Sequence, residues 1–304
     1  MSDMEIIFLG TSSGTPTKSR NVSSLVIRRK SEFFLFDAGE ATQRQLIKAG
    51  IGLRKNFRIF ISHMHGDHVI GLLSILQSYS LLRRREPLEI YGPRGVSEFI
   101  IKNIHMLRFI PSYPIKIQLI SDGVILETEE YRIKALHVDH SIETYAFSLE
   151  EKPRPGKFNP DKARELGIPI KYWKCLQMGK KVVIGNIEIS PQLVVSPPRK
   201  GRKIVISSDT RPVESLIDFA KDADVLIHDS TYGEMHSDKA CENFHSTAKQ
   251  AAEIASKANV RLLILTHFSA RYDDVKELVK EAKEIFPHVM AAEDLMRVSI
   301  PYPS

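Results

Sequence analysis

Four potential metal ligands fall within six consecutive positions of this chain, in the segment Ser62-His63-Met64-His65-Gly66-Asp67-His68. An apolar run over 57–61 precedes the segment and predicts a buried strand, and residues 69–82 follow it with the three-to-four-residue apolar spacing of a helix. Imidazole and carboxylate groups are a common ligand set for zinc and similar divalent ions. Because four polar groups on one turn beside a buried strand have little structural purpose, we expect them to bind metal.

The motif requires more than one ion, because neighbouring side chains diverge. We expect His63 and His65 to face one ion, and Asp67 and His68 to face a second. Each ion then lacks ligands, which should come from the ends of other strands. Three residues follow apolar runs in this way: His140, Asp209 and His267. Asp209 could bridge the two ions with its two oxygens, and a bridged pair would activate water and support in-line displacement at phosphorus.

The other histidines have weaker support as ligands. A lone histidine at a strand end is more often a hydrogen-bonded structural residue, and we interpret five histidines as structural or exposed: His105, His137, His228, His236 and His288. His137 is the main rival to His140, since both lie near the end of the apolar run 131–136.

Periodicity along the chain predicts two similar halves. Short apolar runs bounded by Gly, Pro, Asp or Asn predict strands over 5–9, 24–27, 32–36, 57–61, 88–91, 131–136, 188–195, 203–207, 225–227 and 262–265. Helical spacing predicts helices over 40–49, 69–82, 96–106, 212–220, 246–257 and 273–285. Two halves, each a sheet with outer helices, predict an α/β (α+β) fold, an αββα sandwich in a single domain over 1–304. The 42% hydrophobic content is enough for such a core.

One stretch, residues 151–181, interrupts this rhythm with four prolines and no amphipathic period. We expect it to be an arm inserted into the domain and protruding from it. The whole chain has a formal net charge of +6, and this stretch alone holds nine Lys and Arg against three Asp and Glu. The excess positive charge is therefore concentrated on the expected arm, which favours an anionic partner.

Cysteine content and hydropathy bear on the compartment. Cys175 and Cys241 are the two cysteines, and their separation excludes a disulfide scaffold and a thiolate zinc site. No apolar run approaches the roughly 18 residues that a membrane-spanning helix needs. We expect a cytoplasmic protein with no membrane contact.

The motifs together resemble those of the metallo-β-lactamase superfamily and, within it, of ribonuclease Z, the endonuclease family that removes the 3′ trailer from precursor tRNA. The resemblance covers nearly the whole chain and rests on residues 8–16, 36–40, 63–68, 208–212, 245–247 and 265–272. The His-x-His-x-Asp-His pattern alone identifies only the superfamily, which also holds thioesterases, lactamases and sulfatases. The resemblance implies a metallo-β-lactamase αββα sandwich with a protruding basic arm.

The resemblance also implies roles for the site residues. His63, His65 and His140 would hold one zinc ion, and Asp67, His68 and His267 the second, with Asp209 bridging; manganese or iron are alternatives to zinc. Asp67 would accept a proton from the attacking water. His245 would act as general acid or oxyanion stabiliser, oriented by Asp229, which stands where many relatives carry a glutamate. The products would be a tRNA with a 3′-hydroxyl and a trailer with a 5′-phosphate.

Substrate contacts are implied at two places. Residues 16–21 match a Pro-x-Lys-x-Arg-Asn loop that lies beside the tRNA 3′ end in ribonuclease Z, so Lys18 and Arg20 would contact phosphates and Asn21 a base edge; a solvated turn is the alternative. The arm at 151–181 corresponds to the tRNA-gripping exosite, although it lacks the Gly-Pro step usual in bacterial members. Further contacts are expected from Lys157, Lys171, Lys174 and Arg271.

Two aromatic residues of the arm allow two interpretations. Tyr172 and Trp173, which lie between lysines, could stack on bases or pack into a small core of the arm itself.

The resemblance further implies a homodimer in which the arm of one subunit serves the site of the other. Two other functions are compatible with the fold: a two-metal hydrolase of small phosphodiesters or thioesters, and a non-catalytic RNA-binding relative. The loop and the basic arm argue against the first, and seven intact ligand positions argue against the second.

Overall fold

The computed structural model describes residues 4–53 and 57–303, and its body contains two seven-stranded mixed sheets. The first sheet has the order β18 (Arg297–Ser299), β1 (Met4–Gly10), β3 (Ser24–Arg29), β4 (Glu32–Phe36), β5 (Phe57–Phe60), β6 (Leu88–Gly92) and β7 (Ile115–Leu119). The second has the order β17 (Val289–Ala291), β15 (Leu263–Thr266), β14 (Val225–Asp229), β13 (Lys203–Ile206), β10 (Thr144–Glu151), β9 (Tyr131–Val138) and β8 (Gly123–Glu127).

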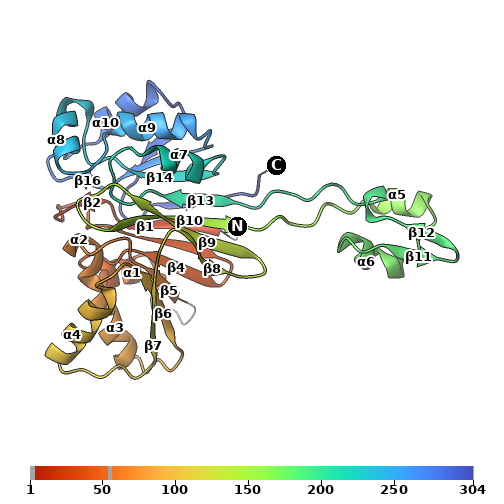
Figure 1. The fold of residues 1–304 in the computed structure, drawn as a ribbon, viewed down its shortest axis with the longest axis horizontal. Helices are drawn as coiled ribbons and strands as arrows, with labels where there is room; N and C mark the ends of the chain where they lie inside the picture. Colours follow the sequence, from red (N-terminus) through yellow and green to blue (C-terminus); the bar gives the residue numbers. More distant parts are fainter. Residues whose placement is uncertain (1–3, 54–56, 304) are drawn as a thin grey trace.

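Helices cover the outer face of each sheet (Figure 1). The first sheet carries α1 (Thr42–Lys48), α3 (Gly71–Leu81) and α4 (Val96–Met106), and the second carries α7 (Glu214–Ala220), α9 (Ala248–Lys257) and α10 (Lys276–Lys283). A central core of buried residues joins the two sheets face to face. The αββα sandwich predicted from the sequence is confirmed. Within the described part of the chain, no helix is both long enough and apolar enough to cross a membrane.

Strand β1 shows why the strands of this fold have apolar residues on both faces of the sheet. Its side chains alternate, so Ile6 and Phe8 pack in the central core while Ile7 and Leu9 pack beneath the helices of the first sheet. Both faces of the strand are apolar because both are covered, which explains the continuous apolar runs in the sequence.

Strand direction brings the chemically important residues to one edge of the sandwich. Strands β4, β5, β6 and β7 are parallel to one another, and so are β13, β14, β15 and β17. Strand β9 runs in the same direction as β13, because each is antiparallel to β10. The carboxyl ends of these strands therefore meet at a common edge, where loops can converge side chains from distant segments.

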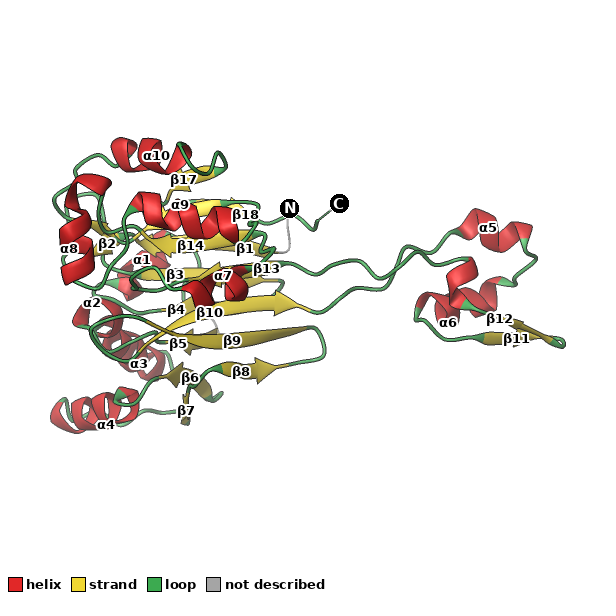
Figure 2. Ribbon diagram, turned by 45° about the horizontal axis from the view of Figure 1, so that its top comes forward, coloured by secondary structure: helices red, strands yellow, loops and turns green. Residues whose placement is uncertain are grey.

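The inserted arm leaves the body after β10 and returns before β13 (Figures 1 and 2). Its outer end contains α5 (Pro160–Glu165), a 3₁₀ turn (Ile170–Tyr172), α6 (Trp173–Gln177) and the hairpin of β11 (Val182–Ile184) and β12 (Ile187–Ile189). The strand predicted over 188–195 is wrong as a strand of the body. Its apolar residues belong to β12, to a 3₁₀ turn at Pro191–Leu193 and to the small core of the arm.

The projecting segment thus continues past residue 181, where the sequence pattern placed its end, to about residue 200. Over 152–200 it holds eleven Lys and Arg against three Asp and Glu, which leaves 32 basic and 34 acidic residues in the remainder. The body is slightly acidic and the arm strongly basic.

A buried ion-pair cluster anchors the root of the arm. The Glu151 carboxylate, at the end of β10, accepts hydrogen bonds from Arg29 Nε at 2.8 Å and from Arg202 Nε at 2.8 Å. Arg202 and Arg154 also lie against the ring of Tyr302, with guanidinium-to-centroid distances of 3.8 and 3.3 Å. The arm is therefore tied to the body on both of its connecting strands.

Candidate metal centre

The His-x-His-x-Asp-His segment leaves the end of β5 and enters the short helix α2 (Gly66–Val69). His63 and His65 lie in the extended part of this turn and meet His140, which follows β9. His65 Nδ1 and His140 Nε2 are 3.1 Å apart, and the His63 ring lies 4.8 and 5.1 Å from the rings of His65 and His140. One nitrogen from each ring lies close enough to the others to share a cation.

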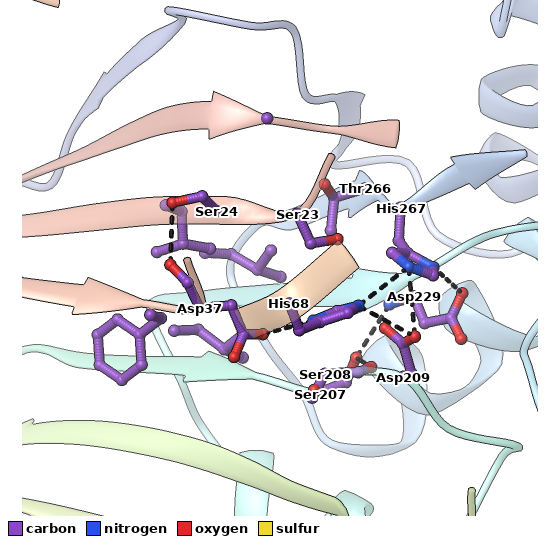
Figure 3. Close-up of a pocket in the computed structure, with 15 residues that line it drawn as sticks. Ser23, Ser24, Asp37, His68, Ser207, Ser208, Asp209, Asp229, Thr266 and His267 are labelled. Atoms are coloured by element: carbon purple, nitrogen blue, oxygen red, sulfur yellow. Dashed lines mark hydrogen bonds and ion pairs between the residues drawn. The ribbon is translucent and has the colours of Figure 1, made fainter. Parts of the chain in front are cut away.

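A second donor set forms where α2 faces the end of β15. Asp67 and His68 lie in the first turn of α2, and His267 follows β15, so that Asp67 Oδ2 is 3.5 Å from His68 Nε2 and 3.6 Å from His267 Nε2. Figure 3 shows His68 and His267 turned toward Asp209. This second group is also compact enough to hold an ion.

Asp209 lies between the two donor sets. Its Oδ2 is 3.3 Å from Nε2 of His68, 3.3 Å from Nε2 of His267 and 3.7 Å from Nε2 of His63. The seven residues singled out from the sequence are therefore brought together, and His140 rather than its exposed rival His137 joins them.

Hydrogen bonds from neighbouring residues aim the ring nitrogens at this centre. Asp37 accepts from Nδ1 of His68 at 2.7 Å and from the Ser62 hydroxyl at 2.8 Å, and Ser62 Oγ in turn lies 2.8 Å from His63 Nδ1. One carboxylate thereby holds Nδ1 of both histidines, directly or through Ser62, which leaves Nε2 of each ring directed at the centre. Asp37 lies in the recognised 36–40 turn, but nothing in the local pattern assigned it this task.

Two further ligand candidates, His140 and His267, are oriented in the same manner. His140 Nδ1 donates to the Phe244 carbonyl at 2.9 Å, and His267 Nδ1 lies 2.8 Å from Thr231 Oγ1. Phe244 and Thr231 were also missed by sequence reasoning, because they act through backbone or hydroxyl groups that have no distinctive spacing.

The donor chemistry fits a divalent cation. His63 Nε2 is buried and has no hydrogen-bond partner among the described residues, an arrangement that costs free energy unless a ligand bonds there. Burial lowers the pKa of His63 well below its usual value, which keeps the ring neutral. Burial also disfavours charge on His68 and His267, but the surrounding carboxylates outweigh it and raise the pKa of His267 to about 10 and that of His68 well above its usual value. The carboxylates therefore attract positive charge to this point.

His245 adjoins both donor sets. It precedes α9, and its ring lies 5.1 Å from that of His140 and 5.2 Å from that of His267. Its Nδ1 is 2.8 Å from Oδ2 of Asp229, a fully buried carboxylate at the end of β14 that also accepts from Thr231 Oγ1. Asp229 holds Nδ1 of the ring, which leaves Nε2 as the nitrogen available to a substrate.

The predicted Pro-x-Lys-x-Arg-Asn loop follows closely after Gly14, whose amide donates to Asp67 Oδ2 of this centre at 2.8 Å. Of the three residues predicted to contact tRNA, two instead make hydrogen bonds that hold the loop against the body. Arg20 donates to the Tyr272 carbonyl at 2.6 Å, and the Asn21 amide nitrogen donates to the Glu40 carbonyl at 2.7 Å. Lys18 is exposed.

The arm residues divide in a similar way. Trp173 packs on Phe158 with ring centroids 5.1 Å apart and donates to the Ile168 carbonyl at 2.9 Å, and Tyr172 packs against the same arm core. Of the two interpretations left open, packing within the arm is the one that the structure shows. The three arm lysines predicted to contact tRNA, Lys157, Lys171 and Lys174, are exposed. Arg271, four residues after the ligand candidate His267, is exposed as well.

Comparison with known proteins gives the family. The family model described as "Anti-Pycsar protein Apyc1" matches residues 4–152, slightly under half of the chain. Among curated proteins, Ribonuclease Z of Nitrosopumilus maritimus is 45% identical over 298 residues, covering 98% of this chain and 100% of the relative. Ribonuclease Z of Bacillus subtilis is 40% identical, with 98% and 99% covered.

Solved structures agree with these relatives. Human tRNase Z, short form, superposes with a TM-score of 0.72 at 29% identity and covers 98% of this chain and 100% of its own. Similarity to relatives of the same name thus extends through both sheets, the metal candidates and the arm, and the chain belongs to the ribonuclease Z family of metallo-β-lactamase-fold hydrolases.

Proposed function

We propose that this chain removes the 3′ trailer from precursor tRNA with two zinc ions per subunit. The observation that carries the proposal is the convergence of two three-residue donor sets on Asp209, directly beside the His245–Asp229 pair. Two adjacent cation sites are the arrangement that supports in-line displacement at phosphorus.

Each donor set would hold one ion, His63, His65 and His140 the first and Asp67, His68 and His267 the second, with Asp209 shared. Imidazole and carboxylate ligands suit zinc, and manganese and iron remain alternatives. Bound zinc supplies Lewis acidity, which lowers the pKa of a coordinated water and stabilises negative charge on a phosphoryl oxygen.

The residues of the chain itself would move the protons. Oδ2 of Asp67 faces His68 and His267, and its second oxygen is the candidate acceptor for the proton of the attacking water. His245 would donate a proton to the leaving 3′ oxygen from Nε2, while Asp229 complements the charge of the doubly protonated ring. The products would be a tRNA with a 3′-hydroxyl and a trailer with a 5′-phosphate.

Cleavage mapping tests this proposal. A 5′-labelled precursor tRNA with a trailer should be cut at the trailer boundary by the zinc-loaded protein, and metal analysis should find two ions per chain. Asp67→Ala and His245→Ala should each lower the cleavage rate while filter-binding affinity for tRNA changes little. Hydrolysis of a small phosphodiester or thioester without any cut in the precursor would favour the alternative hydrolase. Binding of tRNA without any hydrolysis would favour the non-catalytic relative.

The arm is the proposed tRNA-gripping element, because it concentrates positive charge on a projection from a slightly acidic body. Arg154 and Arg199 exchange backbone hydrogen bonds of 2.8 and 2.9 Å across its two connecting strands. Residues 155–198 can therefore be replaced by a two-residue Asn-Gly turn at this pair without disturbing the body.

This arm-less variant should bind precursor tRNA more weakly and with a shallower salt dependence, by about 0.7 to 0.9 in the log–log slope for each phosphate that the protein no longer neutralises. Hydrolysis of bis-p-nitrophenyl phosphate should be retained. The matched control keeps the arm and replaces Lys157, Lys171 and Lys174 with Gln, which should reproduce the change in slope if charge is the cause. An unchanged tRNA affinity in the arm-less variant would show that the arm is not the exosite.

A homodimer is proposed from the apolar surface near the ends of α3 and α4. Leu81 is 78% exposed, Met106 75% and Ile110 90%, and the segment after α4 lies beside the end of α3 through the bond from the Ser112 amide to Ser80. The inward-facing α3 residues Leu72, Ile75 and Leu76 belong to the core, so only the exposed end of this helix is available for the proposed interface. Light scattering should show a dimer for the wild type and a monomer for Leu81→Lys/Ile110→Lys. The cytoplasmic location stays a prediction that cell fractionation would test.

A further inference from the structure

Arg211 lies two residues after Asp209 and contacts the two loops that carry His140 and His245. Its Nε and one terminal nitrogen donate to the Cys241 carbonyl at 2.8 and 2.6 Å, and the other terminal nitrogen is 3.5 Å from an Asp139 carboxylate oxygen. Its backbone amide also donates to the Asp139 carbonyl at 2.9 Å. One side chain thus connects the exits of β13 and β9 with the end of α8 (Ser237–Glu242).

The Arg211 guanidinium also stacks on the ring of Phe244, 3.7 Å from its centroid. Phe244 has a φ of 60°, in the left-handed region that a bulky residue rarely adopts, and such a conformation persists only where its surroundings hold it. This backbone conformation turns the Phe244 carbonyl toward His140 Nδ1, at 2.9 Å, and the next residue, His245, toward Asp229.

These contacts leave little of Arg211 for a substrate. All three guanidinium nitrogens face protein acceptors, and only 30% of the side chain is exposed. A guanidinium can satisfy a carbonyl, a carboxylate and an aromatic face at once because it is planar and presents a fixed fork of donors, which a lysine does not.

We infer that Arg211 is a positioning residue that holds Phe244 in its left-handed conformation, and thereby sets both the metal-facing tautomer of His140 and the place of His245. This inference rests on the proposed roles of those two histidines. Arg211 would then position both a metal ligand, His140, and the proton donor, His245.

Arg211→Met removes the guanidinium group and its charge but keeps an unbranched side chain. Arg211→Lys keeps the positive charge but not the planar set of donors. Both variants should lower the zinc affinity of the protein about 10- to 100-fold, the usual effect of losing a residue that orients a metal ligand, measured by competition with a chromophoric chelator. The control is Arg261→Met, which removes a half-exposed arginine paired with Asp224 at the opposite, amino-terminal end of β15. It should match the wild type.

Kinetics separate positioning from substrate binding. With zinc saturating, both variants should show a lower kcat on precursor tRNA with KM within about twofold of the wild type. They should lose less on bis-p-nitrophenyl phosphate, whose leaving group needs no proton. Thermal unfolding identifies a variant that does not fold, in which case the milder Arg211→Lys carries the test.

Three results would overturn the inference: wild-type zinc affinity and kcat in both variants, a rise in KM alone, or full restoration by lysine. Wild-type zinc affinity and kcat would show that Arg211 positions neither histidine. A rise in KM alone would make Arg211 a substrate contact. Full restoration by lysine would show that its charge suffices without the planar donors. His140→Ala is the parallel test of the proposed function. If it leaves zinc affinity unchanged, the ligand assignment fails independently of Arg211.

Discussion

Stripping the metal with a chelator should reveal opposite protonation states among the clustered histidines. Burial lowers the pKa of His63, and also lowers those of His65 and His140, so these three rings should be neutral at about pH 8. His68 and His267 should both carry a proton at that pH, because Asp209 and its neighbours overcome the effect of burial.

Zinc binds a ring nitrogen through its lone pair, so metal uptake must displace the protons from His68 and His267. Loading the first donor set should release none from its histidines, whereas loading the second should release about two, one each from His68 and His267. The shared water can add up to about one more as it ionises.

The same protonation predicts how the stability of the metal-free protein depends on pH. The pKa of His267 is about 10 in the folded protein and 6.5 without its surroundings, so the folded state binds a proton that the unfolded state releases above pH 6.5. The stabilisation is fully present below pH 6.5 and is lost as the pH rises through about 10. A difference of that size corresponds to on the order of 5 kcal/mol. Zinc should abolish this dependence.

Histidine-selective ¹⁵N labelling would measure the ring protonation directly between about pH 6 and 10, and an indicator dye would count protons during zinc titration. Urea unfolding with and without chelator would give the stability curves. If His267 titrates near 6.5, or zinc uptake near pH 8 releases no protons, the carboxylates do not govern the charge of this centre and the reasoning is wrong.

Three further substitutions test single interactions. Asp37→Asn should lower zinc affinity about 10- to 100-fold in a chelator competition, because Asp37 accepts at both oxygens, from His68 Nδ1 and Ser62 Oγ at Oδ2 and from the Ser62 amide at Oδ1, and an asparagine would turn an NH₂ group toward one of these donors; an unchanged affinity would contradict this. Asp229→Asn should reduce the cleavage rate by about 10²-fold or more at unchanged tRNA affinity, since His245 loses the carboxylate that orients it, and equal single-turnover rates would argue against that role. Glu151→Gln should reduce the free energy of unfolding by about 3 to 5 kcal/mol in urea, because two buried guanidinium groups would face an uncharged amide, whereas exposed Glu188→Gln should change it by under about 1 kcal/mol.

Local patterns predicted the elements that carry the site. The strand before His63 and the helix Val96–Met106 follow from apolar spacing, which is a local property of sequence. The helix predicted over 69–82 divides into α2 and α3, and α2 already begins at Gly66 inside the motif. The ends of elements depend on capping and packing, and are less well encoded by spacing.

The arm shows where local patterns fail. An apolar run over 188–195 has the composition of a body strand, but it packs against Ala163 and Leu176 of the arm instead. Composition cannot distinguish a strand of the main sandwich from a small core that folds on an extension. Trp173 illustrates the same limit, because its spacing between lysines is compatible with base stacking while its contacts are those of a core residue.

The sequence by itself determined the chemistry: the identity of seven ligand candidates, the His245–Asp229 pair, the basic character of the inserted segment and the family. The ligand candidates could be found because they follow strands whose apolar runs are readable, and because parallel strands must place their carboxyl ends together. The His245–Asp229 pair and the family followed from the resemblance of the motifs. Only the tertiary structure decided which groups aim the ligands. Asp37, Phe244 and Arg211 act across contacts between segments that are far apart in the chain, and those contacts exist only once the two sheets have paired and closed.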